Sequence, residues 1–352
     1  MSARPGHLLS GVRRRPPAAP SGTSRWLDIG GPVRYLDFGG PARGPLMVCV
    51  HGLGGSAVNW AAIAPLLTDR FRVIAPDLAG HGLTRSAGRG CDVAANRVLL
   101  HSFLASVSAE PVILMGNSMG GMIALLEASA APERVSRLIL VDPALPFVPA
   151  WPSPVVASAF AIGAIPWIGR TVIDRASSVR PETLVATVLA LCCADPARVP
   201  ADVVAMHVTV AAQRAGFPGV GLDMSAAARS VIATAASSEY RDQIRAVSCP
   251  VLLLHGDRDR LVPVSAARAA AQANPSWSLA ILRGIGHVPQ LEAARASAAI
   301  IGDWLRDADP RPGRRASSRQ RPQPAGVAAR GVRRWRPKLR GAPVHRPPRD
   351  QR

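Results

Sequence analysis

The sequence predicts an α/β fold in which a mostly parallel sheet of eight strands has helices on both faces and carries an inserted helical cap. Short apolar runs alternate with helix-like runs along the chain. Nearly every position of each short run is apolar, as in parallel strands that are buried on both faces. The chain between Asp142 and Val251 is much longer than one crossover between parallel strands requires. We therefore expect an insertion at that point.

An antiparallel hairpin is expected first, at the edge of the sheet. Its strands lie at about 26–29 and 33–38, with Gly30, Gly31 and Pro32 as the turn. Six parallel strands follow, at about residues 46–50, 73–74, 112–115, 138–141, 251–254 and 279–282. Right-handed crossovers between these strands deliver the loops that follow them to one edge of the sheet.

The insertion, residues 145–236, is expected to form a helical cap, because it contains helix-like apolar runs at 184–191 and 203–206. The core of the domain would then comprise residues 26–144 and 237–305. A chain of 352 residues with 48% hydrophobic content suffices for a large core and excludes a fibrous protein. The remaining ends, 1–25 and 306–352, are rich in proline and arginine, which predicts disordered basic tails.

The start of the insertion is unusually apolar, since residues 143–169 include no charged side chain. Prolines leave only 155–165 uninterrupted, which is too short for a helix that crosses a membrane. Its large side chains are expected to pack against the core. The alternative is that they contact a hydrophobic substrate or a membrane surface, and the side chains concerned are Trp151, Phe160, Ile162 and Trp167.

The net charge of +19 is concentrated at the two ends of the chain. Residues 1–25 hold five Arg and no acid, and residues 306–352 hold fourteen Arg, one Lys and three Asp. Basic disordered segments can bind nucleic acid or anionic lipid through counterion release. Lys338 is nevertheless the sole lysine, a bias that a GC-rich coding sequence explains better than selection for phosphate contacts. No specific nucleic-acid partner is therefore expected.

Cysteine usage indicates a reducing compartment. The thiols are odd in number and their spacing fits neither a disulfide framework nor a metal site: Cys49, Cys91, Cys192, Cys193 and Cys249. No apolar region of signal-peptide type follows the basic residues 13–15. A cytoplasmic protein is expected, and the sequence leaves its oligomeric state open.

The most informative motif is Gly116-Asn117-Ser118-Met119-Gly120, which joins the strand at 112–115 to a helix-like run at 122–126. A serine at such a strand-turn-helix corner adopts a strained backbone conformation and projects into a cleft. The flanking glycines are required because a Cβ there would collide with the neighbouring turn. The motif predicts that Ser118 is a nucleophile.

A serine nucleophile needs a base and a carboxylate that orients the base. His287 lies in the loop Gly284–Pro289 after the last strand, and is the expected base. Asp259 follows the strand at 251–254 and is the expected acid. Asp257 in the same loop and Asp142 at the end of the preceding strand remain alternatives for that role.

Two backbone N–H groups are expected to stabilise the negative charge that develops on the substrate oxygen. Leu53 lies in the glycine-rich turn 51–55 directly after a strand, and Met119 follows the nucleophile at the positive end of its helix. Their amides form the predicted oxyanion hole. His51, His81 and His255 stand beside glycines, where hydrogen bonds that stabilise loops are expected instead of proton transfer.

The chain from about Trp26 to about Leu305 resembles the α/β-hydrolase superfamily, and within it the capped serine hydrolases. The resemblance includes the turn 51–55, the segment 77–82, the serine motif and the loops of Asp259 and His287. It implies Ser118, Asp259 and His287 as the catalytic triad, without a cofactor or metal. A serine at the elbow disfavours haloalkane dehalogenases and epoxide hydrolases, which use an aspartate.

The expected activity is cofactor-independent hydrolysis of a small carboxylic ester with a hydrophobic part. The segment 117–121 also looks like the elbow of hydrolases that cleave carbon-carbon bonds in ring-fission products, although the turn 51–55 lacks their usual Gly-Pro-Gly pattern. A haloperoxidase-like perhydrolase would use the same residues. The alternative of another class is a non-catalytic protein that binds a small ligand or interacts through its basic tail.

Overall fold

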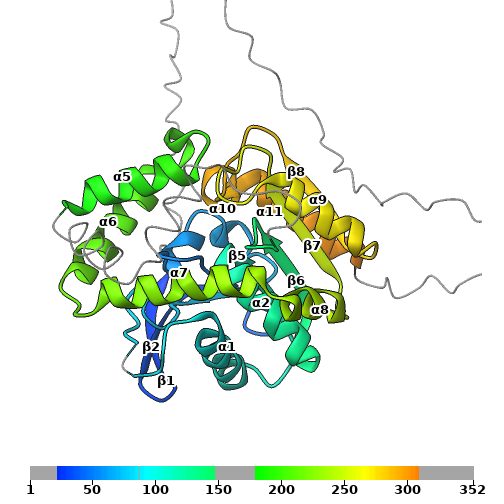
Figure 1. The fold of residues 1–352 in the computed structure, drawn as a ribbon, viewed down its shortest axis with the longest axis horizontal. Coiled ribbons are helices and arrows are strands. Elements are labelled where there is room, and N and C mark those ends of the chain that lie inside the picture. Colours follow the sequence, from blue (N-terminus) through cyan, green and yellow to red (C-terminus); the bar gives the residue numbers. More distant parts are fainter. Residues whose placement is uncertain (1–21, 87, 147–178, 309–352) are drawn as a thin grey trace, which may run out of the picture.

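The computed structural model describes residues 22–86, 88–146 and 179–308. Eight strands form one sheet in the order β1-β2-β4-β3-β5-β6-β7-β8 (Figure 1). The strands β3 to β8 run parallel, while β2 is antiparallel to both β1 and β4. The predicted fold class is therefore confirmed. The strands are Thr23–Asp28 (β1), Pro32–Gly39 (β2), Leu46–Val50 (β3), Arg72–Pro76 (β4), Val112–Asn117 (β5), Val135–Val141 (β6), Val251–Gly256 (β7) and Ser278–Leu282 (β8).

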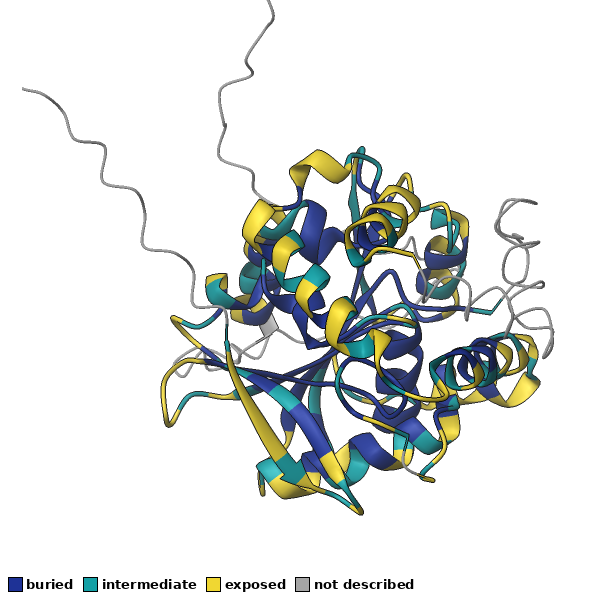
Figure 2. Ribbon diagram, turned by 90° about the vertical axis from the view of Figure 1, so that its left-hand side faces the viewer, coloured by how far each residue is buried: buried dark blue, intermediate teal, exposed yellow. Residues whose placement is uncertain are grey.

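Helices cover both faces of this sheet, because neighbouring residues of a strand point to opposite sides. Leu114 of β5, for example, packs in one apolar cluster with α1, α2 and α8, while Ile113 packs in the other with α11. Figure 2 shows the buried residues gathered in the sheet and on the helix faces that cover it. The helices of the core are Val93–Val107 (α1), Met119–Ala130 (α2), Ser238–Ala246 (α8), Val264–Ala273 (α9), Pro289–Glu292 (α10) and Ala294–Ala308 (α11).

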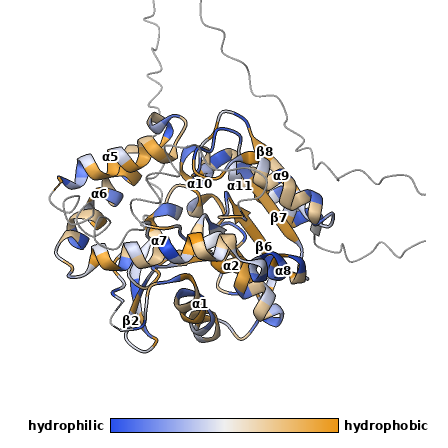
Figure 3. Ribbon diagram, viewed as in Figure 1, coloured by the Kyte–Doolittle hydropathy of each residue, from blue (hydrophilic) through white to orange (hydrophobic). Residues whose placement is uncertain are grey.

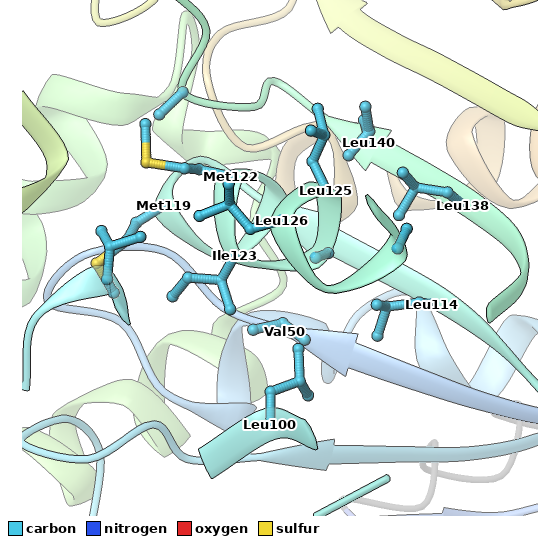
Figure 4. Close-up of a cluster of buried hydrophobic side chains, with 14 of the residues drawn as sticks. Val50, Leu100, Leu114, Met119, Met122, Ile123, Leu125, Leu126, Leu138 and Leu140 are labelled. Atoms are coloured by element: carbon cyan, nitrogen blue, oxygen red, sulfur yellow. The ribbon is translucent and has the colours of Figure 1, made fainter. Parts of the chain in front are cut away.

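Helix α2, which follows the serine motif, is apolar around most of its circumference and almost entirely buried. Figure 4 shows its side chains between those of the central strands and Leu100 of α1. Met119, Met122, Ile123 and Leu125 are all fully buried. Burial of side chains of this size contributes about 1.5–3 kcal/mol each. The helix that follows the serine motif is thus fixed on all sides.

The insert, residues 145–236, contains three helices in its described part: Pro181–Cys192 (α5), Ala201–Ala215 (α6) and Val220–Ala236 (α7). Helices α5 and α6 contain the two apolar runs from which helices were predicted. Helix α7 packs against α1 and contributes Ala227, Val231 and Ala235 to the core cluster. Its small side chains allow this close packing, so the last helix of the insert belongs partly to the core.

Each predicted boundary between the core and a tail lies three residues from the corresponding boundary in the structure. β1 starts at Thr23, because backbone pairing with β2 holds its first residues although their side chains are exposed. α11 continues to Ala308, beyond the predicted end of the core at 305. The rest of both tails lies outside the described residues, as do Trp151, Phe160, Ile162 and Trp167 of the insert.

Within the described ranges, no helix has the length and hydropathy to span a bilayer. Apolar side chains are nevertheless exposed on α5, which Figure 3 shows as largely hydrophobic. Val188 and Leu191 are 48% and 45% exposed. The insert thus presents exposed apolar side chains on α5.

Candidate active site

Ser118 occupies the sharp turn between β5 and α2, with φ 54° and ψ −120°. Among the described residues, only Ser118 and Asp142 combine a side chain with a positive φ. Such a conformation is costly for a residue with a Cβ, and it is typical of residues that the surrounding structure holds for a function. Ser118 is partly exposed, while its neighbours on both sides are buried.

The glycines of the serine motif are required by close backbone packing, as predicted. A Cβ on Gly120 would lie 2.3 Å from the carbonyl oxygens of both His51 and Val50. A Cβ on Gly116 would lie 2.4 Å from the carbonyl oxygen of Gly120. Both distances are far below van der Waals contact. The elbow can therefore form only with glycine at these two positions.

His287 and Asp259 form a buried hydrogen-bonded pair. His287 Nδ1–H donates to Asp259 Oδ2 at 2.7 Å, and both side chains are at most 4% exposed. Burial acts to raise the pKa of Asp259, but the charge of His287, its hydrogen bond and the nearby His255 outweigh burial and hold that pKa at about 2. Asp259 is therefore ionised at neutral pH. The free Nε2 of His287 is then an acceptor, as general base catalysis requires.

The loop of His287 is attached to Asn117, the residue directly before Ser118. The Asn117 side chain donates from Nδ2 to the carbonyl oxygen of His287 at 3.1 Å and to that of Val141 at 3.0 Å. The Ser118 hydroxyl itself makes no hydrogen bond to a described residue. Nucleophile–base hydrogen bonds are often long without substrate. Through these contacts the backbone of His287 is bonded to Asn117, which directly precedes Ser118.

The turn that carries Leu53 lies directly beside Ser118. A Cβ on Gly52 would be 3.0 Å from the Ser118 Cβ, and Gly55 N–H closes the turn on the Gly52 carbonyl at 3.0 Å. Leu53 N–H and Met119 N–H donate to no acceptor within the described part of the chain. Both amides are thus free to bind a ligand, and they come from the two turns that adjoin the serine.

The two alternative acids do not bind His287. Asp257 is exposed and accepts a hydrogen bond from Gly284 N–H at 2.6 Å, so it supports the histidine loop from outside. Asp142 is fully buried and accepts from Gly256 N–H at 3.0 Å. Of the three aspartates, Asp259 is the one in contact with the imidazole of His287.

The other histidines near glycines stabilise loops, as expected. His51 Nδ1–H donates to the Gly52 carbonyl at 2.8 Å, and its Nε2 accepts from Leu78 N–H at 3.0 Å. Burial lowers the pKa of His81 to about 3, and its ring contacts the Ala79 carbonyl. His255 donates from Nε2 to the Val262 carbonyl at 2.9 Å.

Three ligand-type side chains do lie close together, a grouping that the sequence did not indicate. Atoms of Asp142, His255 and Asp259 come within 4.8 Å of one another. The nitrogen of His255 already bonds the Val262 carbonyl, and Asp259 bonds His287. His255 Nε2 and Asp259 Oδ2 are thus already engaged by the protein itself. All five cysteines are free thiols, and burial raises the pKa of each one.

Glu292 supports the loop of His287 through contacts that the sequence did not reveal. Its buried carboxylate accepts hydrogen bonds from Gly286 N–H at 2.8 Å, Ala194 N–H at 3.1 Å and Asp195 N–H at 2.9 Å. His287 N–H also donates to the Cys192 carbonyl at 2.7 Å. These bonds attach the loop of His287 to the end of α5 and the residues that follow it. The only sign of this role in the sequence was a glutamate five residues after His287. That spacing did not indicate which N–H groups its carboxylate would bind.

Replacing Glu292 with glutamine is expected to lower the unfolding free energy by about 1–3 kcal/mol and to reduce catalytic activity. Glutamine has one acceptor oxygen where the carboxylate uses two, so a buried N–H loses its partner. Urea denaturation measures the first effect and ester hydrolysis the second. The exposed Glu110→Gln change is the control and is expected to alter neither quantity. Equal behaviour of the two variants would contradict the role given to Glu292.

A family comparison agrees with this geometry. The sequence model of the family described as alpha/beta hydrolase fold matches residues 45–294, which contain all the site residues above. The chain is 30% identical over 273 residues to a 2-hydroxymuconate semialdehyde hydrolase of Pseudomonas sp. strain CF600, covering 75% of this chain and 88% of the relative.

Two further similarities involve an esterase and a phospholipase. The pimeloyl-(acyl-carrier protein) methyl ester esterase of Aromatoleum aromaticum is 28% identical over 272 residues, which cover 74% of this chain and 98% of the relative. Among solved structures, a bacterial membrane phospholipase A superposes with a TM-score of 0.66 at 25% identity, covering 82% of this chain and 88% of that protein. The fold is therefore shared by hydrolases with different substrates.

Proposed function

Because this chain belongs to the α/β-hydrolase-fold family, we propose that it is a serine hydrolase that cleaves a carboxylic ester with a hydrophobic part through an acyl-enzyme intermediate. The proposal rests mainly on the hydrogen bond from His287 to the ionised Asp259. The loop of His287 is bonded to Asn117, and the next residue, Ser118, has a strained backbone conformation. A nucleophile, a base and an orienting carboxylate in this relation constitute the catalytic triad of acyl transfer.

In the first half of the reaction, Ser118 Oγ attacks the ester carbonyl carbon while His287 Nε2 takes the hydroxyl proton. Asp259 holds the tautomer in which Nδ1 carries hydrogen, and stabilises the imidazolium that forms. The N–H groups of Leu53 and Met119 donate to the negatively charged oxygen of the tetrahedral intermediate, each worth about 3–4 kcal/mol in comparable sites. His287 then gives its proton to the departing alcohol, which leaves an acylated Ser118.

In the second half, water takes the place of the alcohol. His287 removes a proton from that water, whose oxygen attacks the acyl carbon, and the proton then passes to Ser118 Oγ as the acid leaves. Each proton moves between His287 Nε2 and an oxygen atom, which is that of Ser118, of the departing alcohol or of the attacking water. The reaction requires no cofactor.

The preference for a hydrophobic part rests on the insert. Met224 of α7 lies against the turn that carries Leu53, as a Cβ on Gly54 would be 3.2 Å from its Cε. Helix α6 reaches the same side, where Arg214 donates to the carbonyl oxygen of Gly82 at 3.2 Å. We propose that these helices cap the site and line its pocket with mainly apolar side chains.

A second candidate is carbon-carbon bond hydrolysis of a ring-fission product. It is favoured by the 30% identity to the semialdehyde hydrolase and by the segment Asn117–Gly121. The same Ser118 and His287 would serve this reaction. Comparing turnover of a ring-fission product with turnover of p-nitrophenyl esters distinguishes the two activities.

Labelling with a fluorophosphonate probe tests the proposal directly. The probe is expected to modify the native protein on the peptide that contains Ser118, because only an activated serine attacks phosphorus at neutral pH. Mass spectrometry locates the modification, and p-nitrophenyl esters of graded chain length then define the acyl preference. Ser118→Ala is expected to remove the label.

Ser136→Ala is the matched control. Ser136 lies on the neighbouring strand β6, where its hydroxyl donates to the Val112 carbonyl at 2.9 Å, and its loss is expected to leave labelling intact. Absence of both labelling and ester hydrolysis in the folded wild type would overturn the proposal in favour of a ligand-binding protein.

A further inference from the structure

Asp142 and Asp259 bring two buried carboxyl groups together at the ends of neighbouring strands. Asp142 follows β6 and Asp259 follows β7, and both side chains are 0% exposed. His255 lies between them, with its Nε2 at 3.5 Å from Asp142 Oδ1 and at 3.5 Å from Asp259 Oδ2. Two carboxylates in such a site cannot both ionise without a large cost, so their hydrogen bonds must decide which one is charged.

Asp259 has the hydrogen bonds of an anion. Its Oδ1 accepts from Leu261 N–H at 2.7 Å and Val262 N–H at 3.0 Å, and its Oδ2 accepts from His287 at 2.7 Å. Three donors directed at one carboxyl group favour its charged form. The proton of the pair is therefore not on Asp259.

Asp142 has the hydrogen bonds of a neutral acid. Its Oδ1 accepts from Gly256 N–H, but its Oδ2 receives no hydrogen bond from any described N–H or O–H. His255 cannot supply a second charge, since its Nε2–H donates to the Val262 carbonyl and its buried Nδ1 has no partner that a second proton would need. If Oδ2 carried a proton, this unpartnered oxygen would become a hydrogen-bond donor.

The backbone at Asp142 is an independent sign of a constrained role. Its φ is 43°, and it shares this strained class only with Ser118 among the described residues that carry a side chain. The two residues end adjacent strands, β5 and β6, and Ala144 N–H donates to the Ser118 carbonyl at 3.0 Å. The fold thus holds Asp142 in a costly conformation within the layer of residues that forms the site.

We propose that Asp142 is a positioning residue that remains a neutral carboxylic acid and donates its O–H to Asp259, fixing the carboxylate that orients His287. The proposal rests on the proposed function, because it assigns Asp142 a task within that triad. Donation from Asp142 spreads the negative charge of Asp259, which keeps Asp259 ionised and limits its attraction for the proton of His287.

The charged groups around Asp142 agree with this state. Burial raises the pKa of Asp142 well above its ordinary value, and the negative charges of Asp259 and of the more distant Glu292 raise it further, against the single N–H of Gly256. Asp259 faces Asp142 from the loop after β7, His255 faces it from β7, and Glu292 acts from α10. None of these groups offers Asp142 a compensating cation.

Two substitutions separate hydrogen bonding from charge. Asp142→Asn keeps the shape, an N–H donor for Asp259 and an acceptor for Gly256, and asparagine tolerates a positive φ. Asp142→Gly also tolerates this φ but removes the donor. The readout is the acid limb of the pH profile of kcat/KM for a p-nitrophenyl ester, which reports protonation of the general base in the free enzyme.

The glycine variant is expected to move this limb upward by about half a pH unit, because Asp259 then attracts the imidazolium more strongly. It is also expected to lose activity about tenfold as Asp259 loses its fixed orientation. The asparagine variant is expected to keep the limb and most of the activity. A limb that moves to lower pH in Asp142→Asn would show that Asp142 was charged, and an unmoved limb in both variants would show no coupling; either result overturns the proposal.

Infrared difference spectroscopy of the wild type against Asp142→Asn tests the protonation state without turnover. A carbonyl stretch of an un-ionised carboxylic acid at neutral pH, absent from the variant, is expected. If the wild type instead shows the signal of an ionised carboxylate at Asp142, the proposal is overturned, even when the protein is found to hydrolyse esters. Because this measurement needs no substrate, it also gives a result where the glycine variant fails to fold or where the proposed activity fails.

Discussion

Replacing His287 with alanine is expected to lower kcat/KM for ester hydrolysis by about 10⁴-fold or more. Without Nε2, no group accepts the proton of Ser118 during attack, and none returns it to the leaving alcohol. The remaining rate would come from binding and from the amides of Leu53 and Met119. Steady-state kinetics with a p-nitrophenyl ester measures the change, and circular dichroism verifies that the variant is folded.

The matched comparison is the double variant His287→Ala with Ser118→Ala. Residues that act as one unit give losses that do not add, so the double variant is expected to be about as slow as either single variant. A loss equal to the product of the two single losses would contradict a shared mechanism. So would a His287→Ala variant that retains more than about a tenth of wild-type activity.

The second large effect concerns the elbow. Gly120→Ala is expected to destabilise the protein by more than about 4 kcal/mol or to prevent folding, because its Cβ would lie 2.3 Å from two backbone oxygens at the end of β3. Neither oxygen can move away, since both belong to backbone beside the central strands. Denaturant unfolding of the purified variant, or its loss to the insoluble fraction, measures the result.

Gly302→Ala is the control for this substitution. Gly302 lies in α11, and the closest atom to its added Cβ is the flexible end of Arg306 at 3.6 Å. Alanine is the better helix former by about 1 kcal/mol, so the control is expected to be neutral or slightly stabilising. A Gly120→Ala variant as stable as Gly302→Ala would contradict the close packing of the elbow.

Much of this fold could be predicted because local patterns and global structure agree. The runs 46–50, 112–115 and 251–254 are apolar at every position, as buried parallel strands require, and each became a strand. The serine motif was also informative, since glycine at positions 116 and 120 reflects a backbone contact that no other residue permits. His287 and Asp259 each follow a parallel strand along the chain, which predicted that both lie at the same edge of the sheet.

The remaining features depend on tertiary contacts that have no local signal. The choice of Asp259 over Asp257 is decided by side-chain direction, as one carboxylate points to the imidazole and the other to the Gly284 amide. The role of Glu292 depends on N–H groups about a hundred residues earlier in the chain. The inner contacts of α7 follow from small side chains meeting α1. None of these partners can be inferred from spacing.

The position of the insert has a consequence for how this chain can change over evolution. β6 and β7 pair side by side, although more than a hundred residues separate the end of one from the start of the other. The entropy of closing so long a loop grows only with the logarithm of its length, and doubling it costs about 0.6 kcal/mol. Lengthening or shortening the insert therefore barely affects the stability of the sheet, so new substrate ranges can arise by changes in its length while the catalytic framework stays intact.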